Sequence, residues 1–502
     1  MDDYLLSIII FLPIVGAILI ALFGRSTQTI KGIAALFTAA SFVMALSMFI
    51  GFDRSAGAEA YQFTQQFDWI PAINAEYYLG VDGLSAPLVL LTAFLGFLSV
   101  FISWNIKDRV REYFAWLLVL EASILGVFCS LDFLLFFLFW ELELIPMYML
   151  ISIWGTKPPL GRREYSAIKY VAYTFIGSAF MLSGILLLYF KSGDALGANT
   201  FNMVDLADKS GLLFGAVSIL PVIFFFIFIG FAVKLPMFPL HTWLPDAHTD
   251  APTAASVMLA GVLIKMGGYG MIRCVGIFPG VAKDYAWILV LLAVIGVLYG
   301  AAVTLRQIDL KRLIAYSSVS HMGYVLLGIF ALGDVSMTGA ALQMLSHGVV
   351  TGLLFAMVGL VYDKTHERRI PLLGGLARQM PVIAVVFSIA GLASLGLPST
   401  SGFAAEFMTF IGSFNSDKVS YIQLYTILGI AGIVVTAGYI LWMLERVFYR
   451  EPKGEWDGTP DASPLEMATV FSLVLVILLI GIYPRLFTDI MTVPIQIIVG
   501  KL

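Results

Sequence analysis

Long apolar segments follow one another along almost the whole chain, and they constrain the fold more than any other feature. Each is about 20 residues long, which is the length that an α-helix needs to cross the hydrocarbon core of a bilayer. Hydrophobic residues make up 60% of the 502 residues and charged residues only 12%, a composition that excludes a soluble globular protein. The segments are continuous rather than alternating, which argues against a membrane β-barrel. The sequence therefore predicts an all-α polytopic membrane protein.

Hydropathy along the chain predicts about fourteen transmembrane helices, joined mostly by short polar connections. The first apolar segment lacks the basic flank and the cleavage site of a signal peptide, so it is expected to be the first span. No connection is long enough for a folded soluble domain. The predicted spans are residues 4–23, 31–51, 80–104, 114–130, 132–154, 167–189, 213–235, 253–274, 285–304, 311–331, 337–361, 381–397, 421–447 and 464–489.

The distribution of Lys and Arg between alternate loops predicts the orientation of the chain. Most of the 29 Lys and Arg residues fall on one side of the predicted membrane. Because cytoplasmic loops are enriched in these residues, that side is expected to be the inner one. An even number of spans brings both termini to the same side. We therefore expect a bacterial inner-membrane protein with both termini on the outer side.

Two predicted spans are interrupted by proline in a similar way. Pro236, Pro239 and Pro245 break the seventh span, and Pro398 breaks the twelfth within a run of Gly, Ser and Thr. Paired broken helices are typical of transporters with inverted repeats, although prolines can also simply kink helices for packing. The expected parts are N-terminal helices 1–3 (residues 1–110), a first antiporter-like repeat of helices 4–8 (111–275), a second, inverted repeat of helices 9–13 (276–450) and helix 14 (451–502).

Ionisable residues inside the predicted spans are the candidates for function. A charge at the bilayer centre costs at least about 2.5–3.5 kcal/mol on insertion scales, so such residues are rare unless they have a role. Glu141 in the fifth span and Lys234 beside the first break are predicted to form a pair. The carboxylate favours the protonated lysine and desolvation favours the neutral amine, so separating the two would drive the proton onward. The alternative is a static ion pair that only joins two helices.

Further candidates continue from this pair. Lys265 lies on the next span and could receive the proton through water. His321 and His347 lie in the tenth and eleventh spans and titrate near neutral pH, although a lone helical histidine is often only a hydrogen-bonded core residue. Glu406, just after the second break, is the expected terminal carboxylate. The catalytic site is thus predicted to be a proton path of Glu141, Lys234, Lys265, His321, His347 and Glu406.

Other polar residues receive less weight. Glu121 is expected to tune Glu141, and Glu143 is expected to lie on a different helix face, towards a neighbour. The segment HTWLPDAHTD, which holds His241, Asp246, His248 and Asp250, reads as a proline-rich turn with capping aspartates rather than a metal site. Cys129 and Cys274 form no cluster, and no nucleotide-binding motif is present. We therefore predict no cofactor and no metal in this chain.

Several motifs resemble the antiporter-like subunits of respiratory complex I, and most closely the subunit M type, also called chain 4. They are FFLFWELELIPMYMLISIWG, FAVKLPMFPLHTWLPDAHTDAPTAASVMLAGVLIKMGGYGMIR, LIAYSSVSHMGY, LSHGVVTGLLFAMVGLVYDKTHERRI and GLPSTSGFAAEFMTF. The HxWLPDAHxxAP segment is shared by all antiporter-like relatives. The runs LIKMGGYGMIR and YDKTHERR, and Glu rather than Lys at position 406, are typical of chain 4. The resemblance covers nearly the whole chain.

The resemblance implies a function and partners. The six predicted residues occupy the proton-path positions of that family, which implies proton translocation driven by electron transfer from NADH to quinone. By this resemblance the chain is a non-redox subunit of an H⁺-translocating NADH:quinone oxidoreductase, and FMN, iron–sulfur clusters and quinone are expected in partner subunits. The expected partners are neighbouring antiporter-like subunits, other membrane subunits and the lipid bilayer, with no nucleic acid. The second glutamate of WELELIP is similar to cyanobacterial and plastid versions, which are associated with ferredoxin and plastoquinone.

Other functions remain open at this point. One is a subunit of a multisubunit sodium/proton antiporter, which shares the Glu–Lys pair and the broken helices. Another is a membrane subunit of an energy-converting hydrogenase or of a ferredoxin–plastoquinone oxidoreductase. A third, of a different class, is a membrane scaffold whose buried charges only fix helix packing. The sequence gives neither the proton stoichiometry nor the sides at which protons enter and leave.

Overall fold

The computed structural model describes residues 4–55 and 57–502, and about three quarters of the chain belongs to helices, most of which lie side by side. In the described residues, twelve helices are long and apolar enough to cross a membrane. Two shorter apolar helices, α10 (Leu220–Lys234) and α17 (Pro381–Ser394), each precede a break. The predicted helical membrane class is confirmed, whereas the count of fourteen spans and the inverted repeats remain predictions.

The first half of the chain contains nine further helices and the two strands. They are α1 (Leu5–Phe23), α2 (Thr27–Gly51), β1 (Gln62–Ile70), β2 (Ala75–Val81), α3 (Ser85–Ile102), α4 (Val110–Cys129), α5 (Phe133–Leu142), α6 (Leu144–Trp154), α7 (Arg163–Leu196), α8 (Met203–Asp208) and α9 (Ser210–Ala216). A short 3₁₀ turn, η2 (Pro71–Ile73), joins the strands.

The second half follows α10. Its helices are α11 (Trp243–Asp250), α12 (Thr253–Met258), α13 (Ile264–Ile277), α14 (Pro279–Leu305), α15 (Leu310–Phe330), α16 (Asp334–Thr365), α18 (Ser401–Phe414), α19 (Ile422–Leu444), α20 (Pro464–Ile482) and α21 (Arg485–Val499). The shorter turns are η3 (Leu259–Leu263, a π-helix), η4 (Ile370–Leu372), η5 (Leu376–Arg378), η6 (Glu445–Tyr449, a π-helix) and η7 (Gly454–Trp456).

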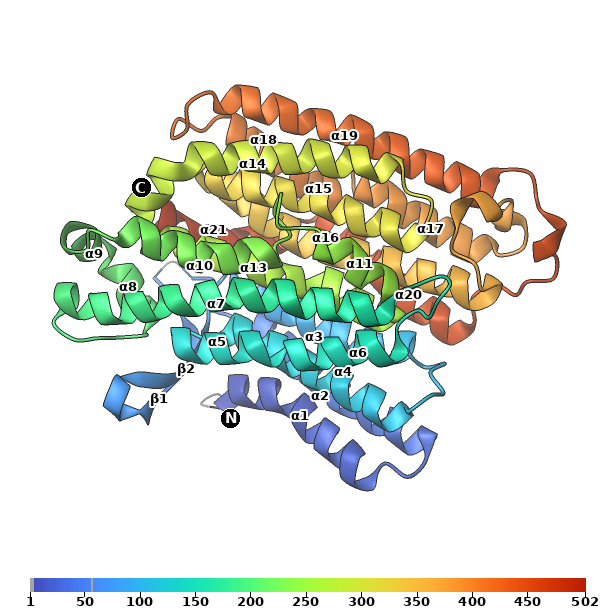
Figure 1. The fold of residues 1–502 in the computed structure, drawn as a ribbon, viewed down its shortest axis with the longest axis horizontal. Coiled ribbons are helices and arrows are strands. Elements are labelled where there is room, and N and C mark those ends of the chain that lie inside the picture. Colours follow the sequence, from blue (N-terminus) through green and yellow to red (C-terminus); the bar gives the residue numbers. More distant parts are fainter. Residues whose placement is uncertain (1–3, 56) are drawn as a thin grey trace.

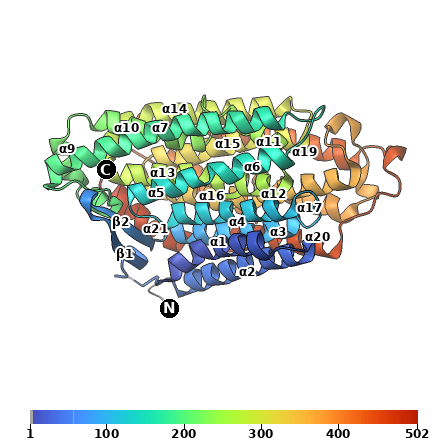
Figure 2. The same ribbon diagram turned by 60° about the horizontal axis from the view of Figure 1, so that its bottom comes forward.

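A β-hairpin was not expected from the sequence and occupies the connection between α2 and α3. Strands β1 and β2 pair antiparallel, and Asn74 in their turn has φ 48°, a conformation that asparagine tolerates better than most residues. The backbone N–H of Glu76 donates to Asp132 Oδ2 at 3.2 Å. The hairpin thus packs onto the start of α5, and Figure 2 shows it at the same end of the molecule as both termini.

The last predicted span is shorter than expected. Residues 464–489 read as one helix, but α20 ends at Ile482 and α21 begins at Arg485. Pro484 lies between the two helices and cannot donate a backbone hydrogen bond, which explains the interruption. The C-terminal helix α21 is therefore a separate element.

The helices that carry the second lysine and the two histidines form the centre of the molecule. The apolar windows of α16 and of the run α12–α13 are completely buried, and that of α15 is 94% buried, whereas α2 and α20 reach only 33%. Glycines of the KMGGYG run bring α13 against α10. A Cβ on Gly267 would lie 2.6 Å from the backbone nitrogen of Leu235, and one on Gly270 would meet the ring of Phe231.

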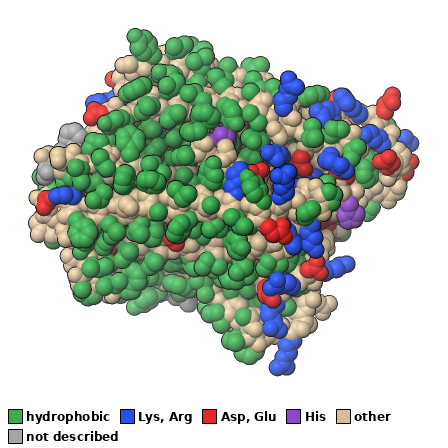
Figure 3. Space-filling view, in the orientation of Figure 1, with side chains coloured by type: hydrophobic (Ala, Val, Ile, Leu, Met, Phe, Trp, Pro, Cys, Tyr) green, Lys and Arg blue, Asp and Glu red, His purple; other side chains and the backbone are tan. Residues whose placement is uncertain are grey.

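The surface divides into an apolar flank and a charged end. Figure 3 shows hydrophobic side chains over most of the visible face and a concentration of Lys and Arg at its right-hand end. The termini and the β-hairpin lie towards the opposite end (Figures 1 and 2). This concentration of Lys and Arg is therefore separated from the β-hairpin by the length of the helices.

Candidate proton path

A helix break positions the first carboxylate. Helix α5 ends at Leu142 and α6 begins at Leu144, so Glu143 is the single residue between them. Pro146, three residues further on, has no N–H and cannot donate to the carbonyl of Leu142. The local turn directs Glu143 inwards, and its side chain is fully buried.

A second break positions the lysine. Lys234 is the last residue of α10, and Pro236 and Pro239 follow in the irregular segment before α11. Trp243, the first residue of α11, donates its indole N–H to the carbonyl of Val233 at 2.9 Å. This bond satisfies a backbone acceptor that the end of α10 leaves free. The hydrogen bond from Trp243 thus stabilises the break, and Lys234 lies at the end of the helix that precedes it.

Lys234 forms a buried ion pair with Glu143, which corrects the predicted pairing with Glu141. Its Nζ contacts Glu143 Oε1, and both side chains are almost completely buried. Tyr170 of α7 donates its hydroxyl to the other oxygen of Glu143, Oε2, at 2.5 Å. The ammonium also lies 5.2 Å from the ring centre of Trp140 and 5.6 Å from that of Tyr170. Glu143 therefore faces the interior rather than a neighbour, and it is the functional candidate that sequence reasoning missed.

The signal for Glu143 was present in the sequence. Residues two apart on a straight helix point to different faces, and that rule placed Glu143 away from Lys234. Pro146 interrupts the helix near this position, so the rule fails there. A glutamate three residues before a proline in an apolar segment is thus a better candidate than its spacing alone implies.

Glu141 lies beside this pair. Its Oε1 atom is buried and has no hydrogen-bond partner in the described residues. Both Lys234 and Glu143 interact with it electrostatically. Its predicted place on the path stays a prediction, but it lies within the field of the lysine.

Lys265 is positioned by a π-helical turn. The segment η3 interrupts the run from α12 to α13 just before Lys265, and such π turns are frequent at functional sites. Lys265 Nζ donates to the carbonyl of Ala260 and lies 2.7 Å from His347 Nδ1. His347 is further held by Thr351, whose hydroxyl donates to the His347 carbonyl at 2.5 Å and lies 3.4 Å from Nδ1. Lys265 thus has a histidine where Lys234 has a carboxylate.

His321 connects this lysine to Glu406. The rings of His321 and His347 are 5.6 Å apart between centres. His321 Nδ1 lies 3.2 Å from Glu406 Oε1, and its Nε2 lies 3.3 Å from the hydroxyl of Ser394. Gly396 leaves room for the carboxylate, because a Cβ there would lie 3.0 Å from Glu406 Oε2. The structure therefore brings together four of the predicted residues, in the order Lys265, His347, His321, Glu406.

The two groups are separate in the described residues. Lys234 and Lys265 share no hydrogen bond or ion pair there, although α10 and α13 touch at Gly267. Near Glu406, the hydroxyls of Tyr324 and Tyr439 and the Oγ1 of Thr436 are buried without partners in the described part of the chain. Buried polar atoms of this kind are normally satisfied, often by ordered water.

The segment around His248 is a helix rather than the expected turn. Residues Trp243–Asp250 form α11, in which Asp246 pairs with Lys169 at 2.6 Å. Asp250 accepts from the hydroxyl of Ser166 at 2.6 Å. His248 is fully buried and its ring stacks on Phe355, so it does not converge with the aspartates.

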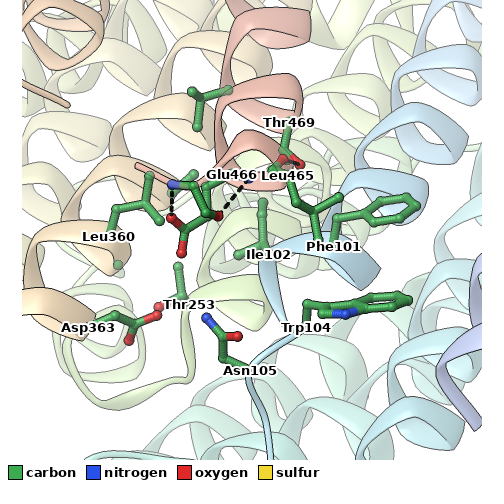
Figure 4. Close-up of a pocket in the computed structure, with 14 residues that line it drawn as sticks. Phe101, Ile102, Trp104, Asn105, Thr253, Leu360, Asp363, Leu465, Glu466 and Thr469 are labelled. Atoms are coloured by element: carbon green, nitrogen blue, oxygen red, sulfur yellow. Dashed lines mark hydrogen bonds between the residues drawn. The ribbon is translucent and has the colours of Figure 1, made fainter. Parts of the chain in front are cut away.

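Glu121 and the best-defined small cavity lie apart from these groups. Glu121 is buried against Gly96 of α3, and its Oε1 lacks a partner in the described residues. A cavity of about 50 Å³ lies between α3, α12, α16 and α20, and Figure 4 shows it lined by Trp104, Asn105, Asp363 and Glu466. None of the predicted path residues lines it.

The arrangement suits proton transfer between fixed positions. Lysine, histidine and carboxylate side chains can each hold or release a proton, and burial makes their exchange sensitive to small changes in separation. Burying a single charge without a partner is costly, so each cation here has a partner within contact distance. The chemistry available is movement of a proton along side chains and water.

A sequence model of the family described as NADH:quinone oxidoreductase/Mrp antiporter, TM, matches residues 130–436 of this chain. This range contains every residue of the predicted path and both breaks.

Relatives and a solved structure cover nearly the whole chain. It is 42% identical to NADH-quinone oxidoreductase subunit M of Rhodobacter capsulatus, over 97% of this chain and 94% of that protein. It is 40% identical to NAD(P)H-quinone oxidoreductase chain 4 of Gloeobacter violaceus, over 96% of this chain and 90% of that protein. A chain of respiratory complex I from Thermus thermophilus with bound NADH superposes with a TM-score of 0.85 at 27% identity, covering 99% of this chain and 100% of that one.

Proposed function

Because this chain belongs to the family of NADH:quinone oxidoreductase and Mrp antiporter transmembrane subunits, we propose that it is a proton-translocating subunit of an NADH-quinone oxidoreductase. The observation that carries the proposal is the buried series Lys265, His347, His321 and Glu406 beside the Lys234 ion pair. Protons would move along these residues while electron transfer takes place in other subunits. Relatives named subunit M and chain 4 support this assignment.

The proposal includes the surroundings of the chain. FMN, iron–sulfur clusters and quinone belong to partner subunits, and this chain has no redox site of its own. Neighbouring membrane subunits, among them other antiporter-like ones, would cover parts of the apolar flank in Figure 3. The end rich in Lys and Arg would face the interior of a bacterial cell, which places both termini outside.

The test uses the native membrane. Lys265→Ala removes the first residue of the series, and we expect proton uptake per NADH to fall by about a hundredfold, since a positioned acid or base contributes that much or more. NADH-driven quinone reduction and proton uptake are measured in the same vesicles. Lys283→Ala is the matched control, because Lys283 is exposed and bonds only to the Leu502 carbonyl in the described residues.

The outcomes separate the competing functions. Loss of proton uptake in an assembled complex supports the proposal and excludes a passive scaffold. Unchanged uptake in Lys265→Ala contradicts it. Sodium-dependent proton exchange in unmodified membranes without NADH-dependent electron transfer would assign the chain to an antiporter instead.

A further inference from the structure

The pair at Lys234 contains one more carboxylate than an ion pair requires. Lys234 contacts Glu143, while Glu141 lies close enough to attract the same ammonium and has a buried oxygen without a partner in the described residues. A buried acceptor that lacks a partner is costly and calls for an explanation. The lysine side chain is long and flexible, so it can exchange one acceptor for the other without movement of the backbone.

The surroundings of Lys234 stabilise its ammonium. The rings of Trp140 and Tyr170 both lie within 6 Å of Nζ, at 5.2 and 5.6 Å, and aromatic faces stabilise a cation that has left water. Trp140 is held in place because its indole N–H donates to Ser178 at 3.1 Å. The ammonium therefore has a fixed aromatic surface beside it while it contacts Glu143.

Tyr170 distinguishes the two carboxylates. Its hydroxyl donates to Glu143 Oε2, so Glu143 has a donor in addition to Lys234, whereas Glu141 Oε1 has none in the described residues. A carboxylate with two donors is the better resting partner for a cation. Tyr170 is on α7, so a shift of this helix would weaken Glu143 as a partner of the lysine.

We propose that Glu143 is a further residue of the proton path, the resting partner of Lys234, and that Glu141 is the alternative partner to which the lysine moves. This inference rests on the proposed function and extends it. The Tyr170 hydroxyl is a positioning group that sets which carboxylate holds the lysine. The only bonds that change are those to the transferred proton. This proton leaves the lysine for the next acceptor when the pair with Glu143 opens.

The experiment compares variants in native membranes, with assembly, quinone reduction and proton uptake measured on the same vesicles. For Glu143→Gln we expect proton uptake per NADH to fall by about a hundredfold, and for Glu143→Asp partial recovery. Tyr170→Phe is expected to retain assembly and to shift the pH dependence of proton uptake. Glu164→Gln, an exposed glutamate on the same helix as Tyr170, is the matched control.

A purely structural role predicts a different pattern. If Glu143→Gln fails to assemble, Glu143→Gln/Lys234→Gln removes both charges and is expected to assemble but not to pump. Pumping by this double variant would overturn the proposal, because the only role of Glu143 would then be to neutralise the charge of Lys234. Full pumping by Glu143→Gln would also overturn it, and an unaltered pH profile in Tyr170→Phe would remove the role of Tyr170. If both Glu143→Gln and Lys265→Ala pump normally, the proposed function itself fails. If Glu143→Gln pumps normally and Lys265→Ala does not, only the role of Glu143 is contradicted.

Discussion

The Lys234 pair and the series from Lys265 to Glu406 hold their acidic and basic groups in different ways. At the first, Lys234 contacts the carboxylate of Glu143 directly, between two aromatic rings. At the second, Lys265 reaches Glu406 only through His347 and His321, beside several hydroxyls. A direct pair stores a charge in a defined place, whereas a histidine series can pass a proton while each member stays neutral for most of the time. The comparison shows that the first site holds its charges in direct contact, whereas the second joins a lysine to a carboxylate through two histidines.

The largest expected difference between the two sites is in stability. Lys234→Met leaves the carboxylate of Glu143 buried without a cation, and breaking a buried pair in this way costs about 3–5 kcal/mol. His321→Asn removes contacts of a group that can be neutral, and the expected cost is about 1–3 kcal/mol. Thermal unfolding of the detergent-solubilised complex measures both. Equal losses would show that the two sites hold charge in the same way.

A smaller effect is expected from narrowing the space beside Glu406. Gly396 has φ 80°, a conformation that costs an L-residue about 1 kcal/mol, and a new Cβ would lie 3.0 Å from Glu406 Oε2. We expect Gly396→Ala to lower stability by about that amount and to reduce proton uptake more than quinone reduction. Gly438→Ala is the control, since no atom lies within 4 Å of the position of its Cβ. Equal effects of the two variants on proton uptake would show that the space between Gly396 and the carboxylate of Glu406 is not needed for it.

The smallest effect concerns the caps of the helices at the two sites. Asp132 caps α5 by accepting from Leu134 and Leu135, and burial raises the pKa of its carboxyl to about 6. Because the folded protein then binds this proton more tightly than the unfolded chain does, the contribution of Asp132 to stability falls as pH rises from about 4 to about 6 and is constant above. Asp132→Asn keeps the acceptor oxygen and should abolish this dependence.

The equivalent cap of α15 is the control for that measurement. Asp309 accepts from the backbone N–H of Arg312 and lies 2.6 Å from Arg368 Nε, so its charge has a partner. Asp309→Asn should therefore lower stability near neutral pH, opposite in sign to the change at Asp132. Unfolding temperatures between pH 4 and pH 8 test both, and a pH-independent wild type would contradict the role of Asp132.

Much of the helical framework follows from the sequence because a helix in a bilayer is defined by length and apolarity alone. Prolines in the sequence indicated the breaks at Lys234 and before Glu406. Glycines lie where α13 contacts α10 closely. The hairpin of β1 and β2 was missed because a polar connection carries no apolar signal of its own. The partner of Lys234 was missed because a straight-helix spacing rule was applied across a turn. The pairings of Lys265 with His347 and of His321 with Glu406 depend on tertiary packing, which the spacing of residues along the chain does not reveal.

The glycine contact between α10 and α13 has a mechanical consequence. At Gly267 the two helices touch backbone to backbone, with no side chain between them that could be compressed or displaced. Backbones that already touch cannot move closer without a clash, so this contact sets a lower limit on the distance between the segments carrying Lys234 and Lys265. A closer approach of the two lysines must therefore come from their flexible side chains and not from the helices that carry them.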